Sequence, residues 1–200
     1  MKHPVSTLSL PILGATLMAS PALAHVPMDD AASFVSGLAH PIFGLDHVLA
    51  MIAVGLWAQQ TGGLSQLKVP VAFVLCMVAG FAMGLLQVPL PFVEPMILAS
   101  IVVLGLAVSV ALRPDARLCI ALVGLFALFH GNAHSAEMGV AGAASFGLGF
   151  VCATMFLHAA GIGIGSGLAH LEYRFGAVNA WLPRIIGGTT ALLGMGLVLA

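Results

Sequence analysis

Long apolar runs alternate with short polar stretches along most of this chain. Six apolar segments lie near residues 40–59, 69–88, 95–112, 118–136, 143–164 and 182–200. Each is about long enough to cross the roughly 30 Å hydrocarbon core of a bilayer as a helix. The segments lack the alternation of membrane β-barrel strands. The pattern therefore predicts an all-α, polytopic membrane protein with about six transmembrane helices in a single domain, residues 25–200.

The first 24 residues differ from the six segments and resemble a cleavable signal peptide. Lys2 gives a basic start, a short apolar stretch follows, and Ala22 and Ala24 fit the A-x-A cleavage pattern. The apolar part is too short, and too broken by two prolines, to make a good membrane span. We therefore predict that residues 1–24 are removed and that the mature chain begins at His25, in the bacterial periplasm.

The basic residues set the predicted orientation. In the mature chain they are Lys68, Arg113, Arg117, Arg174 and Arg184. All of them fall in connections on one side of a six-span arrangement, and cytoplasmic loops are enriched in lysine and arginine. The sequence thus predicts an inner-membrane protein whose mature N-terminus and C-terminus are both periplasmic. The longest predicted loop, residues 165–181, would lie on the cytoplasmic side.

Composition narrows the class of protein further. Hydrophobic residues make up 60% of the chain and charged residues 6%, whereas a soluble domain is roughly 25% charged. A net charge of −1 argues against a nucleic-acid partner. There is no Walker sequence, so no P-loop ATPase activity is expected and no ATPase subunit is evident. The three cysteines are widely separated and form no CxxC pair, which argues against a disulfide framework or a zinc knuckle.

Small residues within the spans indicate where helices approach each other. The stretch GFAMG contains Gly80 and Gly84, and GIGIGSG contains four glycines between residues 161 and 167. Such small-xxx-small spacings allow close packing of membrane helices. We expect both stretches to lie at helix–helix contacts.

Ionisable residues inside the predicted spans form a first cluster in HPIFGLDH. It contains His40, Asp46 and His47. On a continuous helix, the two histidines are seven residues apart and share a face two turns apart, with Asp46 roughly 100° round from His47. Pro41 suits the first helical turn, where its missing N–H costs nothing.

A second cluster lies in FHGNAHSAE, near the other end of the fourth span. It contains His130, His134 and Glu137, which fall on one stripe of a helix within about 60° of each other. The first span runs inward from the periplasm and the fourth runs outward. The two clusters therefore reach the same depth, which predicts one shared site between these spans.

Four imidazoles and two carboxylates form a nitrogen and oxygen ligand set. Such sets suit divalent nickel, zinc, cobalt or copper. A calcium or magnesium site would be richer in carboxylates, and a copper(I) site would favour Met and Cys. Two alternatives remain open from the residues alone: a proton relay, and polar residues that bond helices together. His158, alone in the fifth span, could be an inner metal station or a hydrogen-bonded core histidine.

At these residues the chain resembles a known family. HPIFGLDH fits the H-x5-D-H signature of the HupE/UreJ family of nickel permeases, and FHGNAHSAE resembles its F-H-G-x-A-H-G-x-E signature. The resemblance covers essentially the whole chain. Ser135 stands where the family usually has glycine, and it could fit a close helix contact or add a hydroxyl to the site.

The resemblance implies a permease that imports a divalent metal, nickel(II) above all, for hydrogenase or urease maturation. By motif matching it assigns importance to the residues His40, Asp46, His47, His130, His134 and Glu137. It implies no enzyme activity and no prosthetic group, with nickel as cargo and cobalt or zinc as possible substitutes. Two rival functions stay open: a metal-binding accessory protein without transport, and an intramembrane metalloenzyme. HGNAH lacks the internal glutamate of the zinc-protease HExxH motif.

Overall fold

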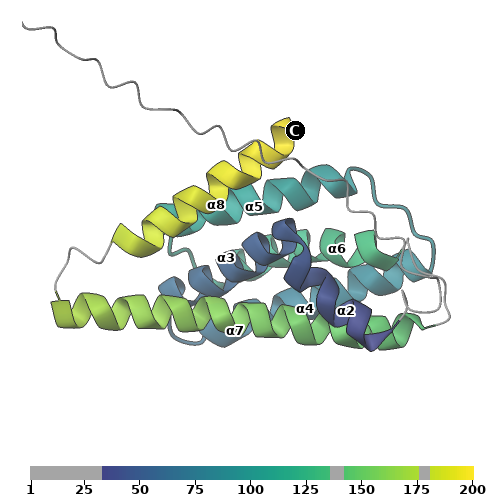
Figure 1. Ribbon diagram of the computed structural model, residues 1–200, viewed down its shortest axis with the longest axis horizontal. Helices are drawn as coiled ribbons and strands as arrows, with labels where there is room; N and C mark the ends of the chain where they lie inside the picture. The colour runs from purple at the N-terminus through teal and green to yellow at the C-terminus, as the bar shows by residue number, and fades with distance from the viewer. Residues whose placement is uncertain (1–32, 136–141, 176–180) are drawn as a thin grey trace, which may run out of the picture.

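Seven helices and no strand make up the part of the chain that the computed structural model describes, residues 33–135, 142–175 and 181–200. They are α2 (Phe34–Phe43), α3 (Leu45–Thr61), α4 (Ser65–Leu85), α5 (Val93–Ser109), α6 (Ala116–Ser135), α7 (Ala143–Phe175) and α8 (Trp181–Leu199). Figure 1 shows them as one bundle. The all-α prediction is confirmed. The predicted signal peptide, residues 1–24, lies outside the described residues.

The centre of the bundle is α3, which packs against α4, α5 and α7 (Figure 1). Its side chains from Met51 through Trp57 are buried on nearly every side. A helix that is apolar all round is typical of an internal position, because it has no polar face to turn outward. The one polar group of Trp57, its indole N–H, donates a hydrogen bond to the carbonyl of Leu112 at 2.7 Å. This bond ties the end of α3 to the chain just after α5.

Four helices are long and apolar enough to cross a membrane: α4, α6, α7 and α8. The pair α2 and α3 passes the same test when the two are taken together, and α5, with 17 residues, is a shorter apolar helix. Many large apolar side chains on the outside of the bundle are exposed, as expected for surfaces that face lipid. The chain is therefore a multi-pass membrane protein.

The first predicted span is wrong in detail, because it is not one helix. α2 ends at Phe43, α3 begins at Leu45, and the two are bent by 79° at Gly44. Pro41 lies inside α2 and not in its first turn, which is instead capped by Ser33. The missing N–H of Pro41 weakens the end of α2. Gly44, in extended backbone conformation at φ −78° and ψ 112°, then starts the new direction.

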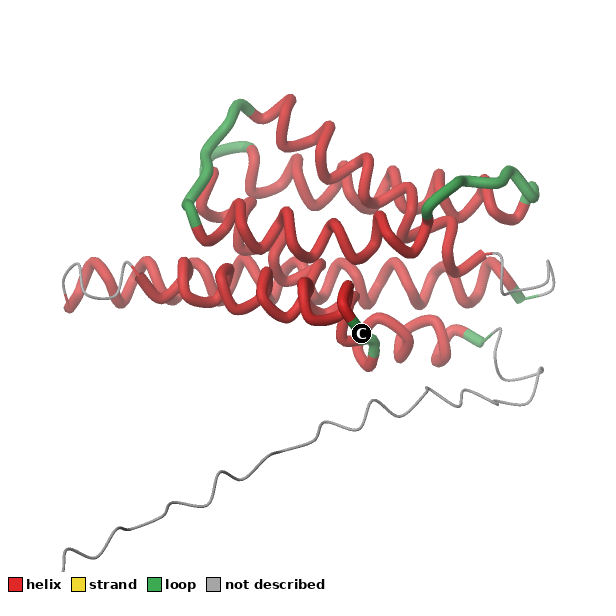
Figure 2. Tube along the Cα trace, turned by 90° about the horizontal axis from the view of Figure 1, so that it is seen from above, coloured by secondary structure: helices red, strands yellow, loops and turns green. Residues whose placement is uncertain are grey.

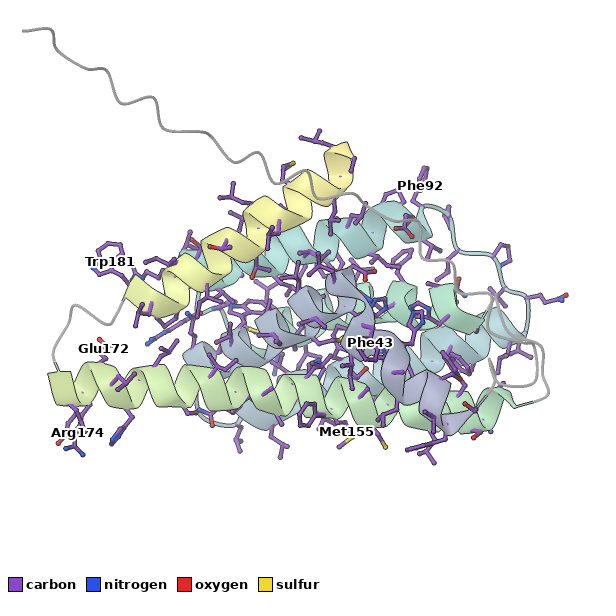
Figure 3. All side chains as sticks on the ribbon, viewed as in Figure 1. Phe43, Phe92, Met155, Glu172, Arg174 and Trp181 are labelled. Carbon is purple, nitrogen blue, oxygen red and sulfur yellow. The ribbon has the colours of Figure 1, made fainter. Side chains whose placement is uncertain are left out.

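Within the predicted loop 165–181, residues 165–175 are not a loop in the structure. α7 continues as a helix through Phe175, so its polar end projects as helix beyond the apolar stretch. Glu172, Arg174 and Trp181 lie at one end of the bundle and Phe92 at the other (Figure 3). Figure 2 shows the long helices side by side between these ends. Short connections join consecutive helices, so these run in alternating directions. All five basic residues of the predicted mature chain consequently lie toward one end.

Glycines let two pairs of helices approach closely. A Cβ added to Gly80 of α4 would meet the backbone of Leu128 of α6, and one added to Gly84 would meet Ser135. This confirms the predicted role of GFAMG. In GIGIGSG, Gly161 lies against the backbone of α3, but a Cβ at Gly163 would meet nothing within 4 Å. The second stretch is thus a helix contact on one face only.

Candidate metal centre

Three imidazoles from three helices meet at the end of the bundle opposite the basic residues. His40 lies on α2, His47 on the first turn of α3 and His134 on the last turn of α6, and one ring nitrogen of each lies within 4.8 Å of the others. Nitrogens bound to one metal at about 2.1 Å are at most about 4.2 Å apart. Small side-chain movements would therefore let all three bind one ion. We call His40, His47 and His134 the outer histidine cluster.

The bend at Gly44 is what brings His40 into this cluster. On a straight helix a seven-residue separation is an axial distance of roughly 10.5 Å. Across the bend, the ring centroids of His40 and His47 are 5.4 Å apart. A Cβ on Gly44 would lie only 3.1 Å from side-chain atoms of both Asp46 and His47. The glycine therefore gives the chain both its change of direction and room for the site.

His47 is at the centre of the cluster. Its Nε2 lies 2.7 Å from Nε2 of His134, a hydrogen bond in which one nitrogen carries the proton. On its other side, Oδ1 of Asp46 lies 2.9 Å from Nδ1, near enough for an ion pair although outside hydrogen-bond geometry. A carboxylate beside Nδ1 favours the proton there and leaves the Nε2 lone pair for a metal. A cation between the two Nε2 atoms would replace the shared proton.

Aromatic side chains of α7 close one side of the cluster. The Phe150 ring lies 5.0 Å from that of His134 and 5.9 Å from that of His47, between centroids. His47 is 2% exposed and His134 is 8% exposed. His40 is half-buried, and the side chain of Asp46 is 30% exposed. Water can therefore reach the cluster on the side of His40 and Asp46, while an apolar wall closes the other side.

His130 lies one helical turn further into the bundle than His134 and is fully buried. Its ring centroid is 5.2 Å from that of His47, but its Nε2 pairs with Oγ of Ser100 on α5 at 3.0 Å. The structure thus brings His130 next to the outer histidine cluster without including it among the three converging nitrogens. Ser100 was missed in the sequence, where nothing distinguishes it from other small residues of a span.

Substitution Ser100→Ala is expected to lower the free energy of unfolding by about 1–3 kcal/mol, the usual cost of leaving a buried polar group without its partner. The variant leaves Nε2 of His130 unpaired in the core. Ser109→Ala, at the other end of α5, is the matched control, and thermal unfolding in detergent provides the measurement. Equal melting temperatures for Ser100→Ala and Ser109→Ala would show that the pairing does not stabilise the bundle.

Two further predicted features have different outcomes. Glu137 lies outside the described residues, so its place in the site stays a prediction. Ser135 is buried, and its hydroxyl donates to the carbonyl of Asn132 at 2.9 Å. It faces Gly84 of α4. Of the two possibilities for this serine, the structure favours a close helix contact.

The fold and the cluster define the class as a helical, multi-pass membrane protein with a buried group of histidines. The family model described as HupE / UreJ protein matches residues 13–197. The chain is also 39% identical over 187 residues to Protein HupE of Rhizobium leguminosarum bv. viciae, covering 93% of this chain and 94% of that protein. No solved structure matches. The chain belongs to the HupE/UreJ family, a family of transport and accessory proteins associated with nickel or cobalt.

Proposed function

We propose that this protein is a permease that carries nickel(II) across the bacterial inner membrane, from the periplasm to the cytoplasm, for hydrogenase or urease maturation. The proposed entry site consists of the residues His40, Asp46, His47, His130, His134 and Glu137. The observation that carries the proposal is the convergence of three imidazole nitrogens within 4.8 Å at the end of the bundle opposite the basic residues. The preference for nickel rests on family membership, since nitrogen and oxygen ligands also accept cobalt and zinc.

The orientation follows from charge. With the basic end in the cytoplasm, the outer histidine cluster lies on the periplasmic side. For a dication, an inside-negative potential supplies about 4.6 kcal/mol per 100 mV, twice the single-charge value. Movement down this field is sufficient to drive uptake without ATP. Facilitated diffusion is therefore the simplest mechanism that fits the proposed site.

The burial of the histidines favours a functional role over a purely structural one. Ionisable side chains within a membrane bundle are costly and generally mark ion paths or binding sites. If these groups only held helices together, both nitrogens of each ring would be paired. His130 and His134 each pair with another helix through Nε2, but the Nδ1 atom of each is buried with no hydrogen-bond partner among the described residues.

Nickel flux into sealed vesicles distinguishes a permease from a binding protein. Purified full-length protein is reconstituted, a potential that is negative inside is imposed, and entry of radioactive nickel is followed. The proposal predicts saturable uptake that depends on the protein and increases with the potential. Tight nickel binding without any flux would instead assign the protein an accessory role.

Asp46→Asn is expected to weaken nickel binding by about 10–100-fold, the usual effect of losing a carboxylate that orients a ligating histidine. The amide keeps the size of the side chain but not its charge. Isothermal titration of the purified protein with nickel measures the change. Asp115→Asn is the control, because the carboxylate of Asp115 caps α6 at the opposite end by accepting from the backbone N–H groups of Arg117 and Leu118. Unchanged affinity in Asp46→Asn would remove this carboxylate from the site.

A further inference from the structure

His158 is a buried histidine with no role in the outer histidine cluster. It lies in the middle of α7, is 2% exposed, and neither of its ring nitrogens has a hydrogen-bond partner in the described part of the chain. A neutral imidazole always carries one N–H donor and one lone pair. Leaving both unpaired in an apolar interior costs free energy. A ligand or water that is not part of the described chain must therefore satisfy this ring for the position to be favourable.

The surroundings of His158 connect it with the proposed entry site. The ring of Phe73, on α4, has its centroid 5.0 Å from that of His158 and 5.8 Å from that of His130. The two histidines thus flank one phenylalanine. Since His130 also lies 5.2 Å from His47 between centroids, the imidazoles form a series that leads from the outer histidine cluster into the bundle.

A cavity continues this series toward the basic end. His158 forms part of the wall of a cavity of about 240 Å³ between α4 and α7. The same wall includes Gln66 and Leu67, in the first turn of α4. Its remaining side chains are apolar, and some of them, such as Val71 and Met155, are exposed, so the cavity opens on the outside of the bundle. The cavity therefore extends from the depth of His158 to the end of the bundle that the charges assign to the cytoplasm.

We propose that His158 is an inner ligand for a divalent transition metal ion on its way from the outer histidine cluster to the opposite end of the bundle. The inference rests on the proposed function. Imidazole nitrogen is a good ligand for divalent nickel, cobalt and zinc, and the two unpaired nitrogens leave a lone pair free for the ion. One imidazole with water binds an ion weakly, and passage requires weak binding at more than one position.

Leucine at position 158 separates this role from a structural one. His158→Leu is expected to lower nickel flux into vesicles about tenfold or more, by analogy with the loss of other metal-site groups. Nickel affinity at the outer histidine cluster should stay unchanged, and thermal stability should not fall, since an unpaired polar ring is replaced by an apolar side chain. His170→Leu, on the exposed end of the same helix, is the matched control. Flux within twofold of wild type in His158→Leu would overturn the proposal.

Cysteine at position 158 provides a direct spectroscopic test and replaces the leucine variant if that one fails to assemble. Upon addition of nickel or cobalt, His158→Cys should gain a thiolate-to-metal charge-transfer band that wild type lacks under the same conditions. Absence of this band would overturn the inner site. If wild-type vesicles take up no nickel, the proposed function fails, whereas the band still decides whether an ion reaches position 158.

Discussion

Substitution His47→Ala is expected to abolish nickel flux. The loss should exceed the roughly 10–100-fold effect of removing a side chain that only hydrogen-bonds to a metal ligand. His47 is the residue on which the site converges. Its Nε2 faces His134, its Nδ1 faces Asp46, and its ring lies beside those of His40 and His130. Alanine therefore removes a proposed ligand and leaves its neighbours without their common partner. Vesicle uptake of radioactive nickel measures the effect.

The control for this variant is His170→Ala, which removes an exposed histidine from the far end of α7. It should transport nickel as wild type does. Amounts of purified monodisperse protein must be matched, so that lost flux is not lost protein. Full uptake by His47→Ala would remove the central residue from the proposed site.

Substitution Gly131→Ala is expected to lower the free energy of unfolding of the bundle by about 3 kcal/mol, the upper end of the usual cost of overpacking a core. This loss corresponds to a fall in melting temperature of roughly 6–12 °C. A Cβ at this position of α6 would meet the carbonyl oxygen of Met77 and the backbone nitrogen of Phe81 on α4. Backbone atoms cannot rotate away, so the two helices must separate. Because Gly131 lies between His130 and His134, this movement would also displace two histidines, and nickel uptake should fall with stability.

Gly163→Ala tests whether this effect depends on the helix contact or on glycine alone. A Cβ there would meet nothing within 4 Å, and alanine favours helix over glycine by up to about 1 kcal/mol. This variant should be as stable as wild type or slightly more stable. Thermal unfolding in detergent, followed by loss of the monodisperse peak, compares the two. Equal melting temperatures for Gly131→Ala and Gly163→Ala would contradict the close packing of α4 against α6.

Much of this architecture could be predicted because hydropathy and charge act over long segments. Over most of its described length, each predicted apolar segment coincides with a helix of the structure, or with two helices in the case of the first segment. The opposite directions of the first and fourth spans predicted that His47 and His134 lie at the same depth, and in the structure their Nε2 atoms are 2.7 Å apart. That prediction needed only helix direction and the rise per residue, which are independent of side-chain packing.

The geometry of the site could not be predicted in the same way. A single glycine is tolerated within many helices, so Gly44 in an apolar run gives no clear sign of a 79° bend. The pairing of Ser100 with His130 and the wall formed by Phe150 arise from the packing of separate helices. The continuation of α7 through residues 165–175 could not be predicted, because a fall in hydropathy is typical both of loops and of helix ends that leave the membrane. Polar residues form helices equally well where a helix leaves the membrane.

X-ray absorption at the nickel edge, on full-length protein with one equivalent of nickel, tests the proposed centre most directly. The outer histidine cluster predicts nitrogen and oxygen ligands only, with the multiple-scattering signal of several imidazoles, and a weaker imidazole signal in His47→Ala. A shell dominated by sulfur, or an identical spectrum in wild type and His47→Ala, would contradict a metal site formed by His40, His47 and His134.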